Sequence, residues 1–198
     1  MSAFQVQCLA SGECKTLPRA LLADLYRIAQ VEREISVVEL HVDEFLGKDP
    51  GGKPISKWFD FKLHTLHGSA IYWHAVERTA HLDLVRLERE EVARGRGCEL
   101  RLWTFADLYA DPTAFSRAKA KYLWLTYQAS EDLPGAKEQI VAAVRGKGRI
   151  SVAKLASTLS IKSETALVAS LQLWKEGKVD EVATSPVSSR LELLPRDV

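Results

Sequence analysis

Two acidic residues and a lysine fall where a β-hairpin can bring them onto one face. Asp60 and Lys62 lie in the aromatic-rich segment 56–65, and Glu77 lies in the returning segment 70–78. Both segments have the composition of strands, and the residues between them favour a turn. Since alternate residues of a strand share one face, Asp60 and Lys62 are expected to point the same way.

The register of this hairpin determines which side chains lie on the same face as Asp60. Thr65 is expected to pair with Ala70, which places Asp60 and Glu77 on one face of the two strands. His74 then belongs to the opposite face. Asp60 also fits a hydrogen-bonded strand residue between aromatic neighbours, and Glu77 fits an ordinary charge at a strand end, because charged residues usually lie at the surface. The pattern alone leaves these interpretations open.

Positive charge is concentrated in one stretch of the second half of the chain. The formal net charge is only +1 at pH 7, so the total charge indicates no partner. Between positions 137 and 162, however, Glu138 is the single acidic residue. The basic residues of this stretch are Lys137, Arg145, Lys147, Arg149, Lys154 and Lys162. A local excess of this kind predicts contact with nucleic acid.

Residues 1–130 predict an α/β domain. Apolar residues at helical spacing predict a helix that begins near Pro18, and the β-branched segment 35–42 predicts a strand. After the hairpin, residues 82–94 predict an amphipathic helix and residues 98–103 predict a further strand. A crossover helix between two strands favours a sheet with a covered face.

Residues 131–198 predict a small winged helix-turn-helix domain. The boundary is expected in the polar, Pro- and Gly-containing segment 129–135. Three helices are predicted at 136–144, 152–159 and 164–176, with Ser151 and Ser163 as the N-caps of the last two, and two wing strands are predicted at 179–182 and 190–194. The exposed face of the third helix is only moderately basic, so DNA contact and protein docking are both open. The candidate DNA contacts are Arg145, Lys147, Arg149, Lys154, Lys162, Ser163 and Thr165.

Composition excludes several classes of protein. A hydrophobic content of 46% is enough for a globular core, and no apolar run approaches the length of about 18 residues that a membrane span requires. The three cysteines show no C-x-x-C spacing, so neither a disulfide framework nor a thiolate zinc site is indicated. We therefore expect a cytoplasmic protein without a membrane partner.

The predicted order of elements resembles that of TnsA, the endonuclease subunit of heteromeric cut-and-paste transposases. The resemblance covers the chain from about Leu17 to Leu194 in arrangement. Residues 97–104, Gly-Cys-Glu-Leu-Arg-Leu-Trp-Thr, closely match the family's G-x-E-L-R-V-x-T, and residues 59–61, Phe-Asp-Phe, resemble its P-D-F. The resemblance implies a restriction-endonuclease-like mixed sheet flanked by helices, followed by a winged helix-turn-helix domain.

The resemblance also implies a magnesium site, from which this chain departs. In such nucleases an Asp and a Glu on adjacent strands hold Mg²⁺, and a Lys two residues after the Glu activates water and stabilises charge. Asp60 matches the Asp. Residues 75–77, Ala-Val-Glu, stand in place of the family's E-V-K, so its Glu and Lys are missing. The family also has a Glu in the upstream helix, where Asp24 is the nearest acid.

Two interpretations of this departure remain. Either the site is lost and the fold is kept for binding, or it has migrated, with Asp60 and Glu77 as magnesium ligands and Lys62 assisting. In both cases the resemblance implies a DNA transposition protein that binds double-stranded DNA at transposon ends. Its partners would be a transposase subunit and an AAA+ ATPase regulator, and a migrated site would make it a DNA endonuclease. The alternative is a non-enzymatic winged-helix DNA-binding regulator or adaptor.

Overall fold

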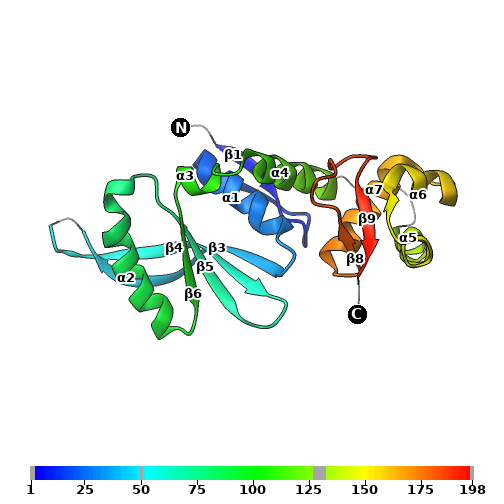
Figure 1. Ribbon diagram of the computed structural model, residues 1–198. Helices are drawn as coiled ribbons and strands as arrows, with labels where there is room; N and C mark the ends of the chain where they lie inside the picture. The colour runs from blue at the N-terminus through cyan, green and yellow to red at the C-terminus, as the bar shows by residue number, and fades with distance from the viewer. Residues whose placement is uncertain (1–2, 50, 127–132, 197–198) are drawn as a thin grey trace. The chain divides into compact units, whose positions relative to one another are not determined.

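The computed structural model describes residues 3–49, 51–126 and 133–196, which form two compact units (Figure 1). The units consist of Met1–Gln30 with Glu34–Phe115, and of Val31–Arg33 with Ser116–Val198. The predicted boundary segment, residues 129–135, lies mostly outside the described residues. Among the described helices, none is both long enough and apolar enough to span a membrane.

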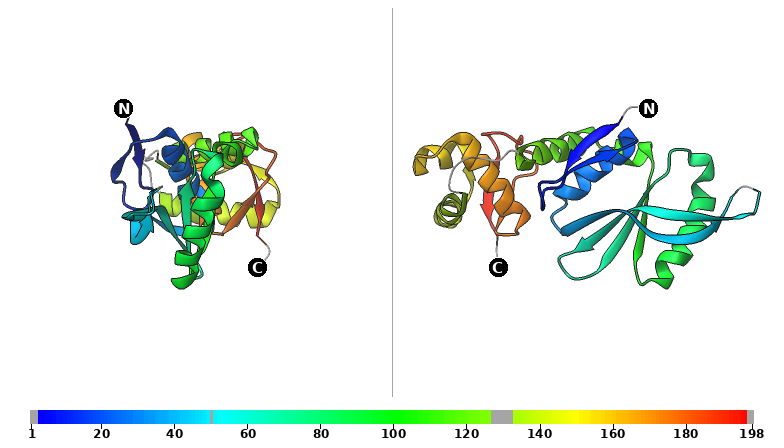
Figure 2. Two further views of the ribbon diagram at one scale, coloured as in Figure 1. Left: turned by 90° about the vertical axis from the view of Figure 1, so that its left-hand side faces the viewer. Right: turned by 180° about the vertical axis from the view of Figure 1, so that it is seen from behind.

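A four-stranded mixed sheet forms the centre of the first unit, as the sequence predicts. Its strands, in the order in which they lie, are β3 (Ile35–Lys48), β4 (Pro54–Thr65), β5 (Ala70–Ala75) and β6 (Glu99–Trp103). The first three pair antiparallel, and β6 runs parallel to β5 after the crossover helix α2 (Leu82–Gly95). β3 and β4 continue past β5 as a two-stranded arm (Figure 2).

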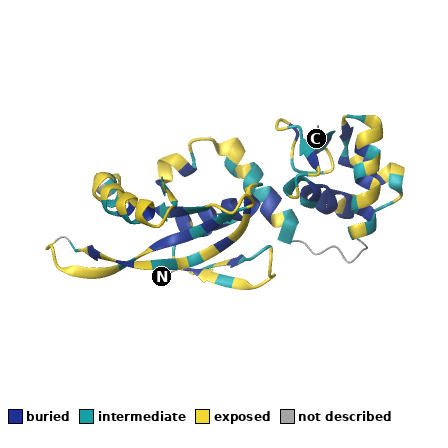
Figure 3. Ribbon diagram, turned by 90° about the horizontal axis from the view of Figure 1, so that it is seen from below, coloured by how far each residue is buried: buried dark blue, intermediate teal, exposed yellow. Residues whose placement is uncertain are grey.

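Helices cover both faces of this sheet. α1 (Ala20–Val31) packs through Tyr26, whose ring lies 6.3 Å from that of Phe61. α2 contributes Ala93 to a cluster with Phe45, Phe59 and Tyr72 on the other face. Buried residues accordingly gather in the centre of β4 (Figure 3). The remaining elements of this unit are β1 (Phe4–Gln7), β2 (Cys14–Leu17), the 3₁₀ turn η1 (Thr79–His81) and α3 (Phe105–Leu108). The helix α4 (Pro112–Thr126) begins in the first unit and belongs to the second from Ser116 onward.

The predicted register of the central hairpin is wrong by one residue. His64, not Thr65, pairs with Ala70. The Thr65 N–H donates to the carbonyl of Ser69, so the loop is the three residues 66–68, one fewer than expected. Gly68 closes this loop with a φ of +81°, and its N–H donates to the carbonyl of Thr65. A shift of one residue moves side chains to the opposite face of a strand. Nδ1 of His74 lies 2.7 Å from Oδ2 of Asp60, so the expected placement of these two residues on opposite faces is also wrong.

After α4, the described part of the second unit contains three helices and a small antiparallel sheet with the order β7-β9-β8. The elements are α5 (Leu133–Lys147), β7 (Ile150–Ser151), α6 (Val152–Leu159), α7 (Ser163–Lys175), β8 (Val179–Glu181) and β9 (Glu192–Pro195). Ser151 caps α6, as predicted, by accepting from the Lys154 N–H. Ser163 is the first residue of α7, so the N-cap is Lys162 and not the predicted serine. Ile140, Leu155 and Leu167 lie in the shared core.

Leu155→Ala tests whether α6 is held by this core. Leu155 is fully buried, so its truncation leaves a cavity and should lower the free energy of unfolding of the second unit by about 2–5 kcal/mol. Ser157→Ala, on the exposed side of the same helix, is the matched control and should change little. Urea unfolding of both variants measures the difference, and equal stabilities would contradict the described packing.

Candidate functional site

Arg19 joins the two carboxylates that the sequence proposes as magnesium ligands. It directly precedes α1, and its Nη2 lies 3.2 Å from Oδ1 of Asp60. Its Nη1 lies 3.1 Å from Oε1 of Glu77, which follows the end of β5. The structure therefore does bring Asp60 and Glu77 together, but through a guanidinium group that binds both of them.

The remaining oxygen of Asp60 is also engaged. Asp60 is only 7% exposed, and its Oδ2 accepts a hydrogen bond of 2.8 Å from the Ala75 N–H. The Nδ1 atom of His74 lies 2.7 Å from the same oxygen. Asp60 is thus a buried carboxylate with partners on both oxygens, the arrangement that makes burial of a charge tolerable.

These partners determine the protonation of Asp60. Burial by itself raises the pKa of a carboxyl group because it removes water from the charged form. Contact with His74, the Ala75 N–H and the charge of Arg19 outweigh burial here and hold the pKa of Asp60 below its ordinary value. At neutral pH the group is therefore an anion bound by its neighbours.

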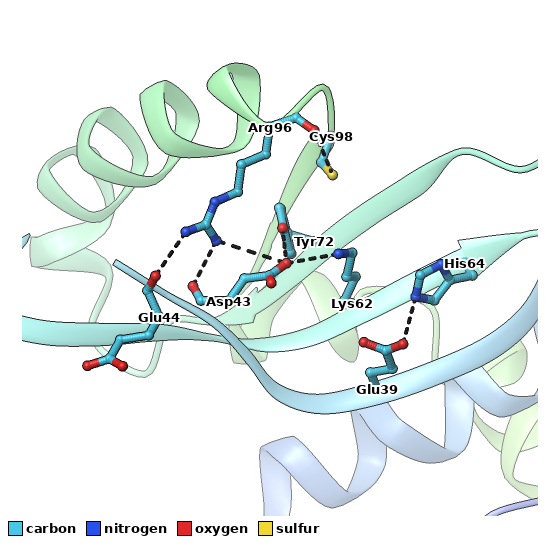
Figure 4. Close-up of polar contacts among 8 residues, drawn as sticks. All are labelled: Glu39, Asp43, Glu44, Lys62, His64, Tyr72, Arg96 and Cys98. Carbon is cyan, nitrogen blue, oxygen red and sulfur yellow. Dashed lines mark hydrogen bonds and ion pairs between the residues drawn. The ribbon is translucent and has the colours of Figure 1, made fainter. Parts of the chain in front are cut away.

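Lys62, the third predicted catalytic residue, is paired elsewhere. Its Nζ lies 3.0 Å from Oδ2 of Asp43, an acidic residue of β3 (Figure 4). The hydroxyl of Tyr72 donates to the same oxygen, and Nη1 of Arg96 lies 3.9 Å from it. Lys62 thus belongs to a second charged cluster, formed with Asp43, Tyr72 and Arg96 on the face of the sheet that α2 covers.

Asp24, the acid nearest to the upstream position expected from the resemblance, is occupied as well. It is buried in α1, where its Oδ1 accepts from Arg27 at 2.9 Å. Its Oδ2 accepts from the Tyr109 hydroxyl at 2.9 Å. Burial and this hydrogen bond raise the pKa of Tyr109 to about 12. Asp24 therefore fastens α1 to the turn after α3.

The residues present do not fit a magnesium ion. Mg²⁺ needs oxygen ligands in near-octahedral geometry, whereas Asp60 and Glu77 face a cation that is already in place. Within the described ranges, no group of three or more His, Cys, Asp or Glu side chains is arranged to hold a metal ion.

The predicted DNA contacts differ in accessibility. Arg145, Lys147, Lys154, Lys162 and Ser163 are exposed. Arg149 is also exposed but forms an ion pair with Glu192. Thr165 is buried at 3% exposure, and α7 is buried from there to Leu171. The first turn of α7 therefore supplies its exposed polar side chains, and the middle of the helix belongs to the core.

Sequence patterns missed the residues that complete both clusters. Arg19 and Asp60 are 41 positions apart, and Arg96 and Asp43 are 53 apart, so no local spacing connects them. Arg96 lies between two glycines that indicate only the end of a helix. The contact of His74 with Asp60 could have been predicted if the loop between β4 and β5 had been recognised as the three residues 66–68.

Comparison with known proteins adds no family assignment. No protein-family model matches the chain, and none of the curated proteins matches it in sequence. The two charged clusters and the order of the elements that position them are therefore the features from which a function can be inferred.

The pH dependence of stability tests the environment of Asp60. Because the pKa of Asp60 is lower in the folded state, its ionised form contributes stability above the unfolded pKa. That contribution is lost as the pH falls below the ordinary value of 3.8 and through the folded value. In urea unfolding across this range, Asp60→Asn should flatten the acid limb of the curve. The exposed Asp83→Asn should retain the wild-type dependence, and the same dependence in all three proteins would contradict the account.

Proposed function

We propose that the protein is a TnsA-like DNA transposition protein that binds double-stranded DNA and a partner transposase, and whose nuclease-like unit has lost its metal site. The observation that carries this proposal is Arg19, which binds Asp60 and Glu77 at the same time. Its position favours a lost site over a migrated one, because a migrated site would require these carboxylates as metal ligands.

A guanidinium group can replace the charge of a metal ion but not its chemistry. Arg19 is permanently protonated and offers N–H donors in a planar fork, which suits two carboxylates. It has no coordination position for water or phosphate, so it cannot generate a hydroxide nucleophile as a metal can. The arrangement supports a structural role for Asp60 and a binding role for the unit.

The order of elements is the second support. A helix, a strand, a hairpin, a crossover helix and a parallel strand follow one another in the first unit, as the resemblance requires. In the second unit, three helices and a three-stranded antiparallel sheet follow in the order expected of a winged helix. Both arrangements agree with a restriction-endonuclease-like domain followed by a winged helix-turn-helix domain.

DNA contact would be made mainly through phosphates. Arg145 and Lys147 lie in the last turn of α5, Lys154 lies on α6, and Lys162 immediately precedes α7. These side chains are exposed, whereas most residues of α7 are buried and cannot contact the edges of the bases. Phosphate contacts fix position and supply affinity without sequence information, so strong salt dependence is expected.

The first unit offers apolar surface for the partner transposase. Leu84 and Leu87 are each 69% exposed and lie three residues apart on α2, which places them side by side on one helix face. Exposed leucines grouped on one helix are a feature of protein contact surfaces. An AAA+ ATPase regulator would be a further partner in such a system.

DNA binding is tested by fluorescence anisotropy with a labelled duplex at several salt concentrations. The double variant Arg145→Gln/Lys154→Gln should bind more weakly and reduce the slope of log K against log salt by about 1.8, because each phosphate contact contributes about 0.9. Lys178→Gln, an exposed lysine beside β8, is the control. Wild-type protein that fails to bind DNA at low salt would overturn the proposal.

Gene context separates transposition from the competing class. Neighbouring genes for a DDE transposase and an AAA+ ATPase would support the transposition protein. Their absence, combined with DNA binding, would favour a winged-helix regulator or adaptor.

A further inference from the structure

Three donors from separate elements converge on one oxygen in the first unit. Oδ2 of Asp43 lies 3.0 Å from Nζ of Lys62 on β4 and accepts from the hydroxyl of Tyr72 on β5. Nη1 of Arg96, which follows α2, lies 3.9 Å from the same oxygen (Figure 4). Two cations and a hydroxyl around a single anionic oxygen make up the donor set that proteins present to phosphate.

Asp43, whose carboxylate accepts from these donors, has an unusual backbone conformation. His41 and Asp43 have φ values of 48° and 57°, in the left-handed region that residues other than glycine adopt infrequently and that Asp and His adopt more often than most. The pairing of β3 with β4 shifts between Val42 and Phe45, so the strand bulges here. Strained residues persist where their surroundings hold them, and they cluster at ligand sites and switches.

Contacts with Arg96 and β4 hold the bulge in place. Nη1 and Nη2 of Arg96 donate to the backbone carbonyls of Asp43 and Glu44, each at 2.9 Å. Within the described sheet β3 is an edge strand, so the bulge can relax while β4, β5 and β6 remain paired. The carboxylate of Asp43 can therefore leave without disrupting the core.

Tyr72, the hydroxyl donor of the three, is held independently of the carboxylate. Tyr72 is fully buried, and its ring stacks on Phe59 at a centroid distance of 3.9 Å. Lys62 and Arg96 have side chains that are 23% and 34% exposed, so the cluster reaches solvent. The hydrogen bond from Tyr72, ahead of the charges of Lys62 and Arg96, holds the pKa of Asp43 below its ordinary value. Asp43 therefore occupies the site as an anion at neutral pH.

We propose that Lys62, Tyr72 and Arg96 form a phosphate-binding site that the carboxylate of Asp43 occupies until a phosphate group displaces it. As a site for a DNA backbone phosphate, this inference rests on the proposed DNA-binding function. Displacement exchanges one anion for another on the same donors and releases the strained backbone of β3. Asp43 is then an internal competitor that weakens DNA binding by the first unit.

Asp43→Asn tests the competition. The variant keeps the shape of the side chain, and Asn tolerates the left-handed conformation, but it removes the competing charge. In duplex binding followed by anisotropy, it should bind several-fold more tightly than wild type. The slope of log K against log salt should steepen by about 0.9, as expected for one added phosphate contact.

The neighbouring Glu44→Gln is the matched control. It removes a charge of the same sign one residue away, but only the backbone carbonyl of Glu44 contacts Arg96. It should show only the general effect of a lost negative charge. Lys62→Gln added to Asp43→Asn should abolish the gain, and circular dichroism confirms that each variant is folded. Equal gains from Asp43→Asn and Glu44→Gln would overturn the inference.

Binding of inorganic phosphate tests the phosphate site independently of its proposed role in DNA binding. In thermal denaturation at constant ionic strength, phosphate should raise the Tm of Asp43→Asn relative to chloride, and Lys62→Gln should remove this shift. A shift together with tighter DNA binding supports the inference in full. A shift without DNA binding by any variant supports a site for free phosphate and overturns the DNA function. If neither phosphate nor duplex distinguishes Asp43→Asn from Glu44→Gln, the site is rejected even when the second unit binds DNA.

Discussion

The pairing of Arg19 with Asp60 and Glu77 is the interaction on which this account depends. Asp60 is buried on β4 beside the last residue of β5, where an uncompensated carboxylate would be strongly destabilising. Arg19 supplies the opposite charge from the start of α1 and at the same time binds the segment after β5. A helix, a strand and a loop are thus connected through one guanidinium group.

The two charged clusters of the first unit, around Asp60 and around Asp43, differ in whether an external anion could replace the carboxylate. Both neutralise an aspartate with basic groups from distant parts of the chain. Asp60 is nearly inaccessible and accepts from backbone and side chains, so its cluster stabilises the fold. Asp43 is partly exposed on a strained edge strand and contacts side chains that suit phosphate. The first arrangement resists ligands, whereas the second can release its anion to admit one.

The sequence predicted the elements better than their contacts. The hairpin, the crossover helix and the order of helices and strands in the second unit follow from local periodicity and turn composition, which act over a few residues. The register failed because Gly68 closes a shorter loop than its composition suggested. Arg19 and Arg96 could not be predicted, since their partners become neighbours only after the sheet has formed.

Metal binding tests the central claim most directly. Isothermal titration calorimetry of Mg²⁺ and Mn²⁺ into wild type and Asp60→Asn, each with and without the same short duplex, compares the proteins under conditions in which DNA could complete a site. If Arg19 has taken the place of a metal, the two proteins give the same heats up to millimolar metal. Saturable binding to wild type that Asp60→Asn abolishes would show that Arg19 yields to a metal ion, and would restore the endonuclease interpretation.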